Sequence, residues 1–165
     1  FFVGRYAQTR PPVLTSPRAK SGFGGVMWLF LAGQIGWLLT LVWQTAYMTS
    51  ELWFMLARNS QTMQAAFVAV VPGLVSIIIG VWVIWQIAAK RSPNAVAFAV
   101  VGVWLMGPCV AMLQSWYFAM ALTELSLIQL FGWSIGWSLY FALSPRVALT
   151  YGTPRGKRIA EGLEM

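Results

Sequence analysis

The sequence predicts an all-α integral membrane protein in which four transmembrane helices form an antiparallel bundle with both termini in the cytoplasm. Of the 165 residues, 59% are hydrophobic and only 9% are charged, which is more apolar surface than a water-soluble domain of this size can bury. Four segments long enough to cross a bilayer contain no Asp, Glu, Lys or Arg: residues 25–48, 65–89, 95–120 and 125–143. Lysine and arginine gather at alternate flanks of these segments.

Residues 1–24 precede the first predicted span and form an extended, proline-rich basic arm. Pro11, Pro12 and Pro17 favour an extended chain, so no regular element is expected there. Because the arm has no core of its own, we expect it to lie on something else. The chain begins with Phe1 rather than Met, so we expect the numbering to start inside a longer gene product.

The first span, residues 25–48, carries Gln34 near mid-depth, with Gly33 and Gly36 close by. The two glycines thin one side of the helix, so a neighbouring helix can approach. A glutamine at this depth hydrogen-bonds to a neighbouring helix or, alternatively, contacts a ligand.

The connections around the second span define its neighbours. Residues 49–64 are too polar to continue the first span, so they form the first external connection. Pro72 lies in the second span, residues 65–89, and is expected to bend its outer third. The basic turn at 90–94 is so short that the second and third spans must be antiparallel neighbours.

The third and fourth spans complete the bundle. Pro108 lies in the middle of the third span, residues 95–120, and predicts a second bend near the bilayer centre. The fourth span, residues 125–143, stops at a serine–proline pair, because proline cannot continue the helical hydrogen bonds. The transmembrane domain therefore covers residues 25–146, and a basic cytoplasmic tail covers residues 147–165.

The basic residues set the predicted orientation. Of eleven Lys and Arg residues, ten lie in the arm, in the 90–94 turn or at the carboxyl-terminal end, and only Arg58 lies in the remaining connections. The positive-inside rule then places both termini in the cytoplasm, and we expect the inner membrane of a bacterium. Topology also explains the net charge of +7, so we expect no nucleic-acid partner.

Three motifs occur in an order that resembles a known family. They are GFGG at 22–25, KRSP at 90–93, and YFALSPRV at 140–147 followed by Thr150. In their order and spacing, residues 22–151 are similar to the bacterial inner-membrane family called domain of unknown function 2569. The resemblance implies four spans and no assigned activity. Pro145 departs from it, because a second basic residue is more typical there.

The spans lack the side chains that carry most enzyme chemistry. The chain has no His, one Cys and four acidic residues, which lie at the membrane boundaries or in the tail. We therefore expect no catalytic residue, no metal site and no cofactor of its own. An apolar setting keeps the Cys109 thiol protonated and inert, and the absence of buried charge argues against an ion pump.

A pair of glycines in the fourth span points to a contact surface. Gly132 and Gly136 form a GxxxG pair, which favours a close helix contact either with the first or third span or with another subunit. Ser134 and Ser138 lie on the adjoining stripe of the same helix.

Four tryptophans lie near mid-depth, where an aromatic belt at the membrane boundary does not reach: Trp37, Trp104, Trp133 and Trp137. They fill the core of the bundle, or they form a rigid wall for a protein partner or an apolar ligand such as a quinone, carotenoid or lipid. Together with Gln34 they are the predicted binding residues.

These observations predict a non-catalytic accessory or assembly subunit of a larger bacterial inner-membrane complex, respiratory or photosynthetic. Its partners would be other membrane subunits and lipids. A first alternative is a small transporter or binder of an apolar ligand, with its site at mid-depth around the predicted binding residues. A second alternative is a homo-oligomer that assembles through Gly132 and Gly136.

Overall fold

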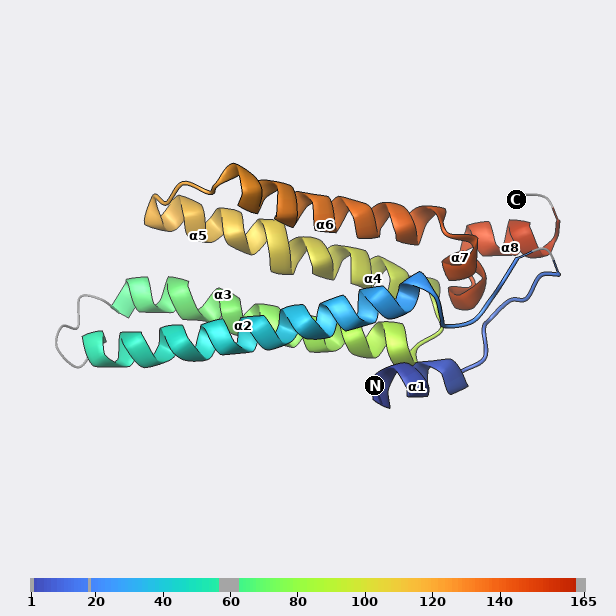
Figure 1. The fold of residues 1–165 in the computed structure, drawn as a ribbon, viewed down its shortest axis with the longest axis horizontal. Helices are drawn as coiled ribbons and strands as arrows, with labels where there is room; N and C mark the ends of the chain where they lie inside the picture. Colours follow the sequence, from blue (N-terminus) through green and yellow to red (C-terminus); the bar gives the residue numbers. More distant parts are fainter. Residues whose placement is uncertain (1, 18, 57–62, 163–165) are drawn as a thin grey trace.

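The computed structural model describes residues 2–17, 19–56 and 63–162, and these are all-helical apart from turns and connections (Figure 1). Four antiparallel segments are long and apolar enough to cross a membrane: α2 (Val26–Leu56), α3 (Met63–Ala89), the run of α4 (Pro93–Trp104), η2 (Leu105–Cys109) and α5 (Val110–Phe118), and α6 (Glu124–Leu143). The chain is therefore a multi-pass helical membrane protein, as the sequence predicts.

The helix bounds differ from the prediction mainly in the first span. The helix α2 continues to Leu56 instead of stopping at residue 48, so Glu51 lies inside a helix. A single carboxylate near a helix end does not stop the helix, since it reaches the polar boundary of the membrane. The rest of the predicted connection, with Arg58, falls at 57–62, outside the described residues.

The two prolines affect their helices differently. Pro72 lies inside α3, which is helical without interruption from Met63 to Ala89. Pro108 lies in η2, a single π-helical turn between α4 and α5. Proline removes a backbone donor, and a π turn is one way in which a helix accommodates that loss. The bend predicted at Pro108 stays a prediction, and a π-helical turn occupies this position.

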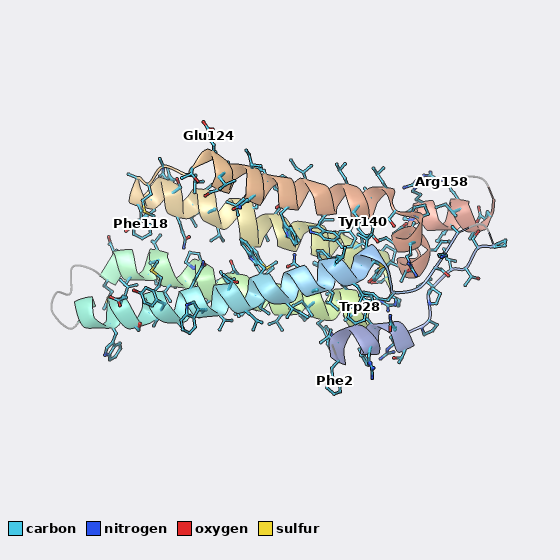
Figure 2. The ribbon with its side chains drawn as sticks, viewed as in Figure 1. Phe2, Trp28, Phe118, Glu124, Tyr140 and Arg158 are labelled. Carbon is cyan, nitrogen blue, oxygen red and sulfur yellow. The ribbon has the colours of Figure 1, made fainter. Side chains whose placement is uncertain are left out.

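Both ends of the chain lie at one end of the bundle, which we call the basal end (Figure 1). It carries three short helices: α1 (Phe2–Thr9), α7 (Pro145–Tyr151) and α8 (Pro154–Ala160). At the opposite, distal end, α5 stops at Phe118 and α6 begins at Glu124, as Figure 2 shows.

The helix α1 corrects the prediction of an arm without regular structure. Gly4 and Ala7 are buried, and the ring of Trp28 lies directly beside Gly4, so a Cβ there would come within 1.9 Å of that ring. Figure 2 shows Trp28 at the start of α2, next to α1. The rest of the arm lies on α7, because the amides of Val13 and Leu14 donate to its carbonyls at 3.2 and 3.0 Å. The arm therefore lies on helices of its own chain.

The helix α7 also corrects the predicted boundary between residues 146 and 147. It runs across this boundary, and Val147, Leu149, Thr150 and Tyr151 are fully buried. Ser144 caps its first turn by accepting a hydrogen bond from the Val147 amide at 3.4 Å. The segment after residue 146 is therefore part of the folded core at the basal end rather than a separate tail.

A hydrogen-bond network centred on Arg91 joins three elements of the basal end. Arg91 donates to the carbonyl of Ile87 at 2.9 Å, to the hydroxyl of Tyr151 at 3.3 Å and to the carbonyl of Ala7. The Tyr151 hydroxyl in turn donates to the Ile87 carbonyl at 2.6 Å. Burial raises the pKa of Tyr151 and lowers that of Arg91. The network ties α1 and α7 to the end of α3.

Most of the buried apolar side chains lie in the basal half of the bundle. They come from the first turns of α2, the last turns of α3, the start of α4, the end of α6 and α7. By contrast α5, which forms the distal half of the third span, has no buried residue. The helices are therefore packed closely at the basal end and more loosely toward the distal end.

Candidate functional site

A groove of about 680 Å³ lies between α2 and α6, and η2 forms its third wall. Gln34 and Trp37 line it from α2, Met106 and Gly107 from η2, and Trp133 and Ser134 from α6. This volume is in the range of sites that hold small molecules. The π turn matters here, since it presents Gly107 toward the groove at the middle of the third span.

An aromatic cluster closes the groove on its basal side. Phe30 of α2 packs edge-to-face on Trp137 and Phe141 of α6, with ring centroids 4.9 and 4.8 Å apart. Trp133 continues the cluster toward the groove, 5.5 Å from Trp137. Edge-to-face pairs at these distances are favourable beyond the area that they bury. Trp133 is the only ring of this cluster among the described residues that line the groove, and the other rings, which include Tyr140 (labelled in Figure 2) on Trp137, pack beyond it. We call this cluster the aromatic floor.

Gly33 fixes the position of the Trp133 ring. A Cβ at Gly33 would come 2.6 Å from the tip of this ring, so only glycine lets the ring lie against α2. The prediction that a neighbour approaches α2 here is confirmed for Gly33. At Gly36 a Cβ would meet no described atom within 4 Å, so the same prediction is wrong there.

Two buried polar side chains line the groove without a hydrogen-bond partner among the described residues. Gln34 is 2% exposed, and its amide makes no hydrogen bond there. Ser134 is 1% exposed, and its hydroxyl has no partner either. Buried polar groups are normally hydrogen-bonded, because leaving one unpaired costs about 1–3 kcal/mol. A ligand oxygen that reached these two groups would supply the hydrogen bonds that they lack.

The groove is electrically neutral. None of the described residues that line it is Asp, Glu, Lys or Arg. Among the described residues, no three His, Cys, Asp or Glu side chains lie close enough to hold a metal ion. Binding in the groove therefore depends on shape, apolar contact and neutral hydrogen bonds.

The structure places three of the five predicted binding residues in the groove: Gln34, Trp37 and Trp133. Trp37 and Trp133 are 41% and 40% exposed, so their rings remain accessible. The other two lie elsewhere. Trp104 donates to the Ser138 hydroxyl at 3.0 Å, and Trp137 packs into the aromatic floor.

Sequence reasoning missed Met106, Gly107 and the role of Ser134. The sequence marked Ser134 only as a small residue suited to helix packing. It marked Met106 and Gly107 only as part of the predicted bend. Ser134 follows Trp133 directly, and both are about 15 Å along α6 from Glu124, at the depth of Gln34 on α2. Matching the depth of polar residues on different spans is the signal that could have paired Gln34 with Ser134.

The predicted glycine contact inside the bundle is wrong. A Cβ at Gly132 or Gly136 would meet no described atom within 4 Å, so neither glycine supports a close contact with the described part of the chain. The helix α6 instead packs on α4 and η2 through its other faces. The alternative, a contact with another subunit, stays a prediction.

Comparisons of the chain with family models, with curated proteins and with solved structures gave no match.

Proposed function

We propose that this protein is a non-catalytic membrane protein that binds an apolar ligand, of the quinone, carotenoid or lipid class, in the groove between α2 and α6. The observation that carries the proposal is the pair of buried, unpartnered polar groups, Gln34 and Ser134, on the walls of a cavity of about 680 Å³. A few polar groups in a mainly apolar cavity are typical of small-molecule sites, and Thr40, Ser126 and Gln129 also line this one. The accessible rings of Trp37 and Trp133 add large apolar contact area.

We place the protein in the inner membrane of a bacterium with its basal end in the cytoplasm. The basal end carries the arm, the 90–94 turn and the helices α7 and α8, which together hold all nine of the Lys and Arg residues that the structure describes. The bacterial inner membrane is proposed from the order of the motifs at 22–25, 90–93 and 140–147 alone, because no family model matches the chain. Reaction of single engineered cysteines at Ser92 and Ser126 with a membrane-impermeant reagent tests the orientation, in a Cys109→Ala background.

The experiment that tests ligand binding compares two tryptophans. The chain is purified in mild detergent, and its bound small molecules are extracted and identified by mass spectrometry. We expect Trp133→Leu to lose the ligand, because it removes a wall of the groove. Trp104→Leu is the matched control, since Trp104 lies at similar depth but outside the groove. Equal retention of the ligand by both folded variants would contradict the proposal.

The outward face of α6 favours a second candidate function, that of an accessory subunit in a larger respiratory or photosynthetic membrane complex. Gly132 and Gly136 leave a shallow strip on the helix, next to the large exposed side chains of Ile128, Ile135 and Leu139. This strip runs along the edge of the groove, which Ile128 and Gly132 also line. Such a strip suits close contact with a helix of another subunit. Native purification followed by mass spectrometry of co-purifying chains tests this, with Gly136→Ile expected to release the partner. A self-association lost in Gly136→Ile would indicate a homo-oligomer instead.

A further inference from the structure

We infer that the groove selects a quinone-class ligand, with a planar ring that bears neutral oxygen atoms on an apolar chain, and that Gln34 and Ser134 hold this ring. The inference rests on the proposed function, because it assigns the ligand of the same groove. It is argued from hydrogen bonding, from depth and charge, and from shape.

The hydrogen-bonding groups argue against a pure hydrocarbon. Gln34 offers two N–H donors and a carbonyl acceptor, and Ser134 offers one donor and two acceptor lone pairs. Both side chains are buried in the wall of the groove, and neither has a partner among the described residues. A hydrocarbon ligand would seal both groups in an unpaired state, whereas a ligand oxygen would satisfy them.

Depth and charge argue against a phospholipid head group. Ser134 is ten residues from Glu124 along α6, which is about 15 Å into a hydrocarbon core of about 30 Å. A phosphate at this depth would need a cation beside it, and none of the described residues lining the groove is charged. The polar head that reaches Ser134 is therefore neutral.

The shape of the groove favours a flat ring over a flexible glyceride neck. Trp37 and Trp133 supply broad aromatic surfaces from two different helices, and aromatic pairs prefer offset or edge-to-face packing. On the third side, Gly107 has no side chain to cover the hydroxyl of Ser134. A Cβ there would lie 3.6 Å from that oxygen. Because the Ser134 hydroxyl is fully buried, a thin planar head needs less displacement of its neighbours to reach it than a branched neck does.

The test measures equilibrium binding of three probes to the full chain in mild detergent. The probes are a benzoquinone with a ten-carbon tail, a diacylglycerol with two eight-carbon chains, and squalene as the oxygen-free hydrocarbon. The variants are Gln34→Leu and Ser134→Ala. Ser76→Ala is the matched control, because Ser76 is also fully buried with an unpartnered hydroxyl but does not line the groove.

We expect the quinone to bind most tightly, and each of Gln34→Leu and Ser134→Ala to weaken it about tenfold, as one lost buried hydrogen bond would. Ser76→Ala should leave the quinone affinity unchanged. If Gln34→Leu fails to fold, the test is the comparison of the quinone affinities of Ser134→Ala and Ser76→Ala.

Two results overturn the inference in distinguishable ways. If squalene or the diacylglycerol binds more tightly than the quinone, or if Ser134→Ala does not change the quinone affinity, while Trp133→Leu still abolishes binding, the ligand class is wrong and the groove remains a binding site. If Trp133→Leu leaves the affinity of every probe unchanged, or no probe binds at all, the proposed function fails as well.

Discussion

Replacing Arg91 by Met should destabilise the basal end by about 2–4 kcal/mol. The guanidinium donates to two backbone carbonyls, those of Ile87 and Ala7, and to the hydroxyl of Tyr151. Hydrogen bonds from a charged donor contribute about 1.5–3 kcal/mol each. We take less than their sum, because Arg91 is only partly buried and because Tyr151 still donates to Ile87 in the variant.

The control for this prediction is Lys90→Met. It removes the same charge from the same turn, so any effect on membrane orientation is shared, but Lys90 is exposed and contacts only the ring of Trp82, at 5.9 Å, among the contacts of its side chain that the structure describes. Unfolding in mixed detergent micelles, followed by tryptophan fluorescence, gives the free energy of unfolding of each variant. We expect Lys90→Met to change it by less than about 0.5 kcal/mol. If Arg91→Met and Lys90→Met lowered the free energy of unfolding equally, the stabilising role of the Arg91 network would be refuted.

Two further predictions concern the same free energy of unfolding. Gly102→Ala should lower the free energy of unfolding by about 1–3 kcal/mol, because the new Cβ would come 2.3 Å from Val83. Gly36→Ala places its Cβ in open space, so it should leave the free energy of unfolding unchanged or raise it by up to about 1 kcal/mol. Adding Val83→Ala to Gly102→Ala should restore part of the loss, and no restoration would count against the clash. Burial raises the pKa of Tyr151 above its ordinary value near 10, so the stability that its neutral form contributes is complete below about pH 10 and is lost as the pH rises further. Measurements from pH 8 to 11 should show this loss, and Tyr151→Phe should reduce it.

The four spans could be predicted from the sequence because the cost of burying charge in lipid leaves long uncharged segments. The ends of the elements could not. Glu51 lies inside α2 because polar side chains are tolerated where a helix reaches the membrane boundary. The helix α1 forms because Gly4 and Ala7 fit against the bundle, and this tertiary contact leaves no separate signal in a proline-rich stretch.

The candidate site could be predicted only in part, because depth along a helix can be read from a sequence and rotation about its axis cannot. Gln34, Trp37 and Trp133 have the predicted depth and also face the groove. Trp104 and Trp137 have a similar depth, but their helices turn them toward Ser138 and into the aromatic floor. The same unknown rotation explains the glycine pair on α6, at which a Cβ would meet no described atom within 4 Å although Gly132 borders the groove.

The aromatic floor separates the part of the molecule that stabilises the fold from the part proposed to bind. The Arg91 network lies at the basal end, beyond Phe30 and Trp137, and none of its members lines the groove. Sites this far apart with no shared partner have additive effects. Arg91→Met should therefore lower the free energy of unfolding without changing the affinity for the quinone probe. Ser134→Ala should weaken the affinity for the quinone probe without lowering the free energy of unfolding. If Arg91→Met weakened probe binding while the protein remained folded, the groove would depend on the basal end, and the floor would not isolate it.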